Sequence, residues 1–307
     1  MLKYILKRFG YLLLVIVAVS FVVFSMLQFT PGDPARMILG PTATNEALAE
    51  LREQLGLNDP FLIQYFRYFT NMVFHADLGT SYYTKRPVLT EIMAVVPNTI
   101  LLATVATILA SVFGVLMGVV SAVKQYSLID AFVTVFSLIG TSVPIFWYGL
   151  LMILLFSVTL GWFPPSGFTS IKEMILPSLA LGIQSTSMIA RMTRSSMLEV
   201  LHQDYVNMAR SKGQREIVVI FKHILRNSLV PIITVIGIQF GSLLGGACFT
   251  EIVFSIPGLG RLMVESIKMR DYPVVLGGVF FAGVFVSIVN WLADILYAVV
   301  DPRIART

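Results

Sequence analysis

Long apolar segments recur along this chain and leave little choice of fold. A helix needs about 20 apolar residues in succession to cross the hydrocarbon layer of a membrane, and six segments approach or exceed that length. They lie at residues 10–29, 98–123, 131–158, 174–193, 229–253 and 275–297. Only 13% of the 307 residues are charged, which is about half the fraction usual in a soluble domain. The sequence therefore predicts an all-α membrane protein with about six transmembrane helices, kinked at Pro144 and Pro177.

The N-terminal segment has features of a signal peptide, because Lys3, Lys7 and Arg8 precede its apolar run. That run is longer than the roughly 7 to 15 residues of a signal-peptide core, and no small-residue cleavage site follows it. We therefore expect residues 1–29 to form an uncleaved first transmembrane helix with its cytoplasmic end.

The distribution of charge predicts the orientation in the membrane. If the N-terminus is cytoplasmic, the inner segments hold 13 basic and 6 acidic residues, and the outer segments hold 9 basic and 11 acidic residues. Basic residues collect on the cytoplasmic side of membrane proteins. This pattern predicts a multi-pass membrane protein with both termini cytoplasmic, including a tail at residues 301–307.

The segment 30–97 is too polar and too rich in turn signals to lie in lipid, as its TPGDP, LGLNDP and DLGTSYYTKRP stretches show. We expect it to form an extracytoplasmic cap. Within it, Ala47, Leu51, Leu55 and Leu57 recur at helical spacing and predict a short amphipathic helix. The remaining residues, 98–300, are assigned to a five-helix core.

The loop at 191–228 carries the strongest pattern in the chain. Apolar residues recur every three or four positions before and after a single glycine: Leu198, Leu201, Tyr205 and Met208, then Gly213, then Ile217, Ile220 and Ile224. Glycine at that place indicates the end of a helix. The loop therefore predicts a helix, a turn and a second helix. Its basic residues are also consistent with a solvated face that only sets orientation, whereas insertion into DNA is excluded by the two flanking membrane spans.

This loop reads YVNMARSKG and then HILRN, and it resembles the permease subunits of bacterial ABC importers in the dipeptide, oligopeptide, glutathione and nickel branch. The matching residues are Tyr205, Val206, Ala209, Arg210, Lys212, Gly213, His223 and Asn227. Ser211 departs from the usual alanine. Further stretches resemble the same family in order and spacing, namely TPGDPAR, LGLNDP, DLGTSYYTKRPV, FSIPGLGRLMVESIKMRDYPVV and LYAVVDPRI.

The resemblance implies a type I importer permease fold with a cytoplasmic coupling helix, located in the bacterial inner membrane. It also implies the partners: a second related permease, two cytoplasmic ATP-binding cassette ATPases and an extracytoplasmic solute-binding protein. The ATPase-coupling loop would comprise Tyr205, Val206, Met208, Ala209, Arg210, Lys212, Gly213, His223 and Asn227. Gly213 would be its pivot and Tyr205 or Met208 its anchor. The alternative is that these residues only pack the loop against the inner membrane surface.

The chain contains no G-x-x-x-x-G-K-[ST] run, the glycine-rich loop that holds nucleotide phosphates. We therefore expect no enzymatic activity and no cofactor or metal in this chain, with ATP and Mg²⁺ bound by the partner ATPases.

Polar residues within the spans are candidates for the translocation path, because an unpaired polar group in hydrocarbon is costly. They are Gln184, Ser187, Gln239 and Asn290. Hydrogen bonding between helices is the equal alternative for each. An ion-coupled secondary transporter or channel is the alternative function, but only Glu251 and Asp294 come near to intramembrane carboxylates. The sequence leaves open which solute is carried: a dipeptide, an oligopeptide, glutathione, haem or a nickel chelate, with small peptides expected.

Overall fold

The computed structural model describes residues 2–28, 33–40 and 42–300, and it is almost entirely helical. The elements are α1 (Leu2–Gln28), α2 (Pro34–Leu39), α3 (Asn45–Gln54), α4 (Phe61–His75), α5 (Val88–Val123), α6 (Leu128–Ser142), α7 (Ile145–Met152), the π-helix η1 (Ile153–Thr159), α8 (Ile171–Leu201), α9 (Asp204–Ser211), α10 (Glu216–Val218), the π-helix η2 (Val219–Leu225), α11 (Arg226–Val253), α12 (Leu259–Met269) and α13 (Tyr272–Val300). The tail assigned to 301–307 and the side chain of Asp294 lie outside the described part. The predicted all-α membrane fold is confirmed.

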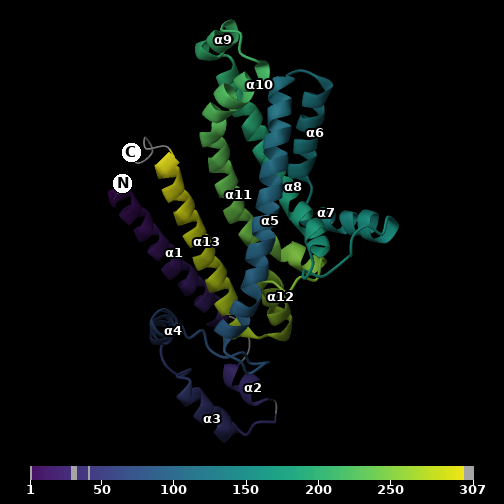
Figure 1. The fold of residues 1–307 in the computed structure, drawn as a ribbon. Helices are drawn as coiled ribbons and strands as arrows, with labels where there is room; N and C mark the ends of the chain where they lie inside the picture. The colour runs from purple at the N-terminus through teal and green to yellow at the C-terminus, as the bar shows by residue number, and fades with distance from the viewer. Residues whose placement is uncertain (1, 29–32, 41, 301–307) are drawn as a thin grey trace.

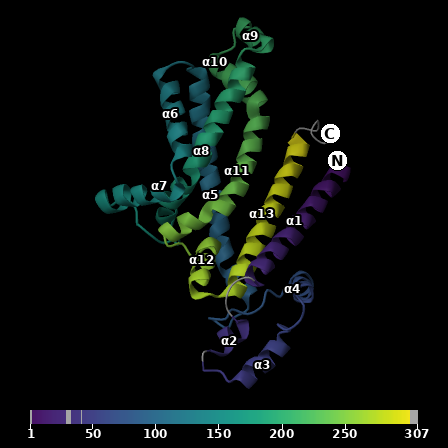
Figure 2. The same ribbon diagram turned by 180° about the vertical axis from the view of Figure 1, so that it is seen from behind.

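The long helices form one bundle with α9 at one end and α2, α3 and α4 at the other (Figures 1 and 2). We call these the α9 end and the cap end. The first residues of α1 and the last of α13 both lie toward the α9 end (Figure 1). This arrangement is the one expected when both chain ends and the 191–228 loop share one side of the membrane.

Length and composition alone identify four of these helices as able to cross a membrane. They are Phe9–Met26, Val88–Val123, Glu216–Val253 and Tyr272–Leu292, and α6 with α7–η1 forms a bent fifth candidate. The fourth predicted span, 174–193, lies within α8, which is less apolar. Many of its polar residues, such as Ser178 and Ser185, are buried against neighbouring helices instead of facing lipid. Among the described helices α8 is therefore a protein-covered member of the bundle.

The third predicted span, 131–158, is broken rather than kinked. Helix α6 ends at Ser142, α7 begins at Ile145, and the two parts meet at 108°. Pro144 has no N–H to donate and pushes Val143 into an extended conformation, so the helix cannot continue. In Figure 1, α7 projects sideways from the bundle.

The cap contains the predicted amphipathic helix as α3, which Thr44 caps at its N-terminus. Its buried residue is Leu48, with the predicted Ala47 and Leu51 half-buried, whereas the predicted Leu55 and Leu57 follow the end of the helix at Gln54. Helix α5 begins at Val88, within the segment assigned to the extracytoplasmic loop. The first turns of this helix therefore belong to the cap end.

A buried carboxylate joins the cap to the bundle. Asp271, between α12 and α13, is 3% exposed and accepts hydrogen bonds from the Ser81 hydroxyl and from the Tyr82 N–H at 2.9 Å. The DLGTSYYTKRP and MRDYP stretches, almost 200 residues apart, thus form one contact. Burial beside this carboxylate raises the pKa of Tyr82 to about 12.

Candidate functional site: the α9 loop and the polar residues of the bundle

The loop at 191–228 folds as a helix, a turn and a second helix, as predicted. Helix α9 ends at Ser211, and Gly213 follows with φ +74°, a conformation that side chains other than glycine rarely adopt. The Gly213 N–H donates to the Arg210 carbonyl at 2.9 Å. The second helix begins at Glu216 and continues through η2 into α11. The turn therefore depends on a left-handed residue.

The predicted single apolar stripe is wrong in detail, because the helix is interrupted at residues 202–203, between α8 and α9. Leu198 and Leu201 belong to the end of α8. On α9 the buried residues are Val206 and Ala209, whereas Tyr205 and Met208 are 42% and 58% exposed. The apolar pattern does not reveal the interruption between α8 and α9, because the spacing of three and four residues continues across it.

The buried face of α9 packs on the end of the bundle. Val206 and Ala209 lie in one apolar cluster with Val119 of α5 and Met197 of α8, and Ile224 of η2 completes it. The adjacent face, about 100° round the helix, is exposed and presents Tyr205 and Met208. A short helix seated in this way can transmit force to the bundle while offering an apolar surface to another protein.

Most polar residues matched in the loop brace its turn. Arg210 makes two bonds to Glu216 across the turn, from Nη2 to Oε1 at 2.8 Å and from Nε to Oε2 at 3.2 Å. The Glu216 carboxylate raises the pKa of Arg210. His223 Nε2 bonds to Gln214 Oε1 at 2.8 Å, and Asn227 Nδ2 donates to the His223 carbonyl at 2.6 Å. These side chains shape the loop, while Lys212 is exposed at the α9 C-terminus.

The four translocation-path candidates lie at two different helix contacts. Gln184 Nε2 donates to the Val143 carbonyl at 3.2 Å, which satisfies an acceptor at the α6–α7 break. Ser187 is buried and donates to the Ile183 carbonyl at 3.0 Å. Only the Gln184 bond joins two helices, because Ile183 belongs to α8 as Ser187 does, and a path-lining role of both residues stays a prediction.

The other two candidates lie on α11 and α13. Gln239 is half-buried and Asn290 is exposed. A Cβ added at Gly241 would lie 2.6 Å from Asn290 Oδ1, so the Asn290 amide covers the bare backbone of α11 at that glycine. Both side chains keep exposed area where α11 and α13 meet, so their pore-lining role stays a prediction.

Besides Asp271, two buried acidic residues are absent from the predicted site residues, although Glu251 was considered as an intramembrane carboxylate. Asp130 is 5% exposed and pairs with Arg194 of α8, and Glu251 is fully buried at the cap end. Glu251 accepts from Thr99 Oγ1 at 2.6 Å and from the Arg261 N–H at 3.0 Å. Arg194 and Thr99 are far from these acidic residues in the sequence, so only an acidic residue inside or next to an apolar segment marked these places.

The chain matches two protein-family models along nearly its whole length. Residues 112–306 match the binding-protein-dependent transport system inner membrane component family. Residues 1–103 match the N-terminal region of binding-protein-dependent transport system membrane components. The α9 loop and helices α6 to α13 fall in the first match, α1 and the cap fall in the second, and α5 begins in the second and ends in the first.

Several curated relatives align with the full chain. The dipeptide transport system permease protein DppB of Alkalihalophilus pseudofirmus is 41% identical, with 99% of each chain covered. The oligopeptide transport system permease protein AppB of Bacillus subtilis is 42% identical, again with 99% of each covered. The glutathione transport system permease protein GsiC of Salmonella paratyphi A is 43% identical at the same coverage.

Solved structures support the fold independently. The inward-facing MetNI methionine ABC transporter matches with a TM-score of 0.56 at 19% identity, covering 69% of this chain and 97% of that one. An amino acid ABC transporter matches with a TM-score of 0.51 at 18% identity, covering 68% and 94%. The resemblance drawn from the YVNMARSKG loop is confirmed, and the chain belongs to the family of inner membrane components of binding-protein-dependent transport systems, the permease subunits of ABC importers.

Proposed function

We propose that this chain forms half of the translocation pathway of an importer for small peptides or related solutes. The observation that carries the coupling role is α9, which buries Val206 and Ala209 in the bundle and leaves Tyr205 and Met208 exposed. An exposed apolar pair on a firmly seated helix suits insertion into a cleft of another protein. The relatives named above are permeases for dipeptides, oligopeptides and glutathione.

In this proposal, partner subunits provide the other functions of the importer. A second related permease completes the pathway, two ATPases bind ATP and Mg²⁺, and a binding protein delivers the solute. The basic α9 end is cytoplasmic and the cap end faces the binding protein, in agreement with the positive-inside distribution of charge. This chain contributes no group to ATP hydrolysis.

Purification of the chain in mild detergent from its native membrane tests the proposal. We expect mass spectrometry to identify a second permease and one or two ATPases with a glycine-rich phosphate loop, and the eluate to hydrolyse ATP. A stable homo-oligomer without ATPase activity would overturn the importer assignment in favour of a secondary carrier.

The exposed face of α9 gives a direct test of docking. Replacing Met208 by aspartate places a charge where the proposed interface is apolar, and we expect the ATPases to bind the permease at least about tenfold more weakly. Binding is measured by ATPase titration on detergent-solubilised permease. The Met269→Asp variant is the matched control, because Met269 is similarly exposed but lies at the end of α12 at the cap end. Unchanged ATPase affinity of the Met208 variant would exclude docking through this face.

A further inference from the structure

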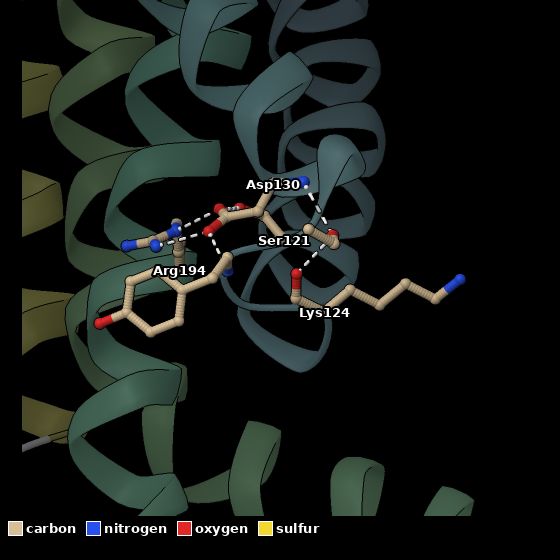
Figure 3. Close-up of polar contacts among 6 residues, drawn as sticks. Ser121, Lys124, Asp130 and Arg194 are labelled. Carbon is tan, nitrogen blue, oxygen red and sulfur yellow. Dashed lines mark hydrogen bonds and ion pairs between the residues drawn. The ribbon is translucent and has the colours of Figure 1, made fainter.

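An ion pair joins α6 to α8 at the α9 end of the bundle. Asp130 lies in the first turn of α6, and Arg194 reaches it from α8. Arg194 Nε lies 2.7 Å from Oδ1 of Asp130, and Nη2 lies 2.8 Å from Oδ2. Figure 3 shows the guanidinium facing the carboxylate, with both bonds formed side by side. This two-point geometry is stronger and more directional than a single charged contact.

The same carboxylate also holds two further segments. Ser121 Oγ on α5 donates to Oδ1 of Asp130 at 2.5 Å, and the Tyr126 N–H donates to Oδ2 at 3.0 Å. Tyr126 has φ +62°, an unfavourable conformation for a residue with a side chain. One buried side chain thus accepts four hydrogen bonds from α5, the α5–α6 turn and α8, which offsets the cost of removing its charge from water.

The three helices joined in this way are already close-packed. A Cβ at Gly118 of α5 would lie 2.5 Å from the Thr193 Cβ of α8. A Cβ at Gly140 of α6 would lie 2.1 Å from Ser187 Oγ of the same helix α8. Such close contacts leave no space for one helix to shift against another. The helices α5, α6 and α8 therefore move together as long as their ends are joined.

Helix α9 touches only part of this unit. The apolar cluster that buries Val206 and Ala209 contains residues of α5 and α8, such as Val119 and Met197, but among the described residues it contains none of α6. A displacement of α9 therefore reaches α5 and α8 by direct packing. At this end of the bundle it reaches α6 through the bonds to Asp130 and the short connecting turn.

We propose that Asp130 and Arg194 are positioning residues that carry movement of α9 to α6 and, across the break at Pro144, to α7. This inference rests on the proposed docking of α9 to an ATPase. With the ion pair intact, α5, α6 and α8 respond as one body to ATPase closure. With the pair broken, α5 and α8 follow α9 while α6 lags, so ATP is hydrolysed without matching solute transport.

The test measures solute uptake and ATP hydrolysis in the same vesicles, using the whole complex with its binding protein. For Arg194→Gln and Asp130→Asn we expect the ratio of solute transported to ATP hydrolysed to fall at least about fivefold, the lower bound of a typical coupling effect. Arg194→Lys, which keeps the charge but loses the fork, should give an intermediate ratio. Arg191→Gln is the matched control, since Arg191 is an exposed arginine on the same helix, and its ratio should stay at the wild-type value.

A merely stabilising role would lower the amount of assembled complex and both rates together, leaving the ratio unchanged, and that result would overturn the inference. If a single variant fails to assemble, the double variant Asp130→Asn, Arg194→Gln avoids an unpaired buried charge. Its ratio should be low, and a wild-type ratio would again overturn the positioning role. A wild-type complex that shows no ATP-driven uptake would instead overturn the proposed function itself.

Discussion

The Gly213→Pro variant should insert and assemble in the membrane but lose nearly all ATP-driven transport. Proline fixes φ near −65°, whereas Gly213 has φ +74°, and proline also lacks the N–H that donates to the Arg210 carbonyl. The cost is on the order of 3 kcal/mol, enough to reduce the native turn about 100-fold relative to other conformations. Transport into vesicles, normalised to assembled complex, measures the loss.

Two milder substitutions show whether backbone conformation is the cause. A Cβ at Gly213 would meet no atom within 4 Å, so a larger side chain causes no collision. Gly213→Asn should keep most of the transport activity, because asparagine tolerates the left-handed region, and Gly213→Val should be much worse. Wild-type transport by the proline variant would contradict the coupling role of this turn.

The spans and the turn were predictable because each depends on local sequence. Apolar length identifies the segments that cross a membrane, and Gly213 marks a helix end without any knowledge of its neighbours. The helix α8 was predicted at the right place, yet the burial of Ser178 and Ser185 could not be foreseen. Their partners are other helices, and hydropathy cannot distinguish a lipid-facing polar residue from a protein-facing one.

Non-local contacts account for the site details that sequence analysis missed. Asp130 and Arg194 are 64 positions apart and appeared in the sequence only as two charges on inner loops. The interruption between α8 and α9 at residues 202–203 determines which face of α9 is exposed, and no glycine or proline marks it in the sequence. Arg210 and His223 were singled out by resemblance, and their bonds within the loop follow only from the folded turn.

Loss of the Glu251 side chain should destabilise the cap end more than any other single truncation there. Glu251 is fully buried, and its two oxygens accept from Thr99 Oγ1 and the Arg261 N–H. Thr99 Oγ1 in turn accepts from the Leu259 N–H at 2.9 Å. The side chain therefore fixes the first turn of α12 against α5 and α11, and Gly258 provides the space, since a Cβ there would lie 2.2 Å from a Glu251 oxygen.

The Glu251→Leu variant leaves the Thr99 hydroxyl and the Arg261 N–H without this acceptor, at a cost of about 1 to 3 kcal/mol for each. We expect the thermal unfolding midpoint of the detergent-solubilised complex to fall by roughly 6 to 15 °C. Thr99→Val, which removes one bond of the network, should give a smaller decrease. Thr104→Val is the control on the same helix, because the Thr104 hydroxyl donates only to the Ile100 carbonyl of its own helix. Equal midpoints for the Glu251 and Thr104 variants would show that this network does not hold α12 in place.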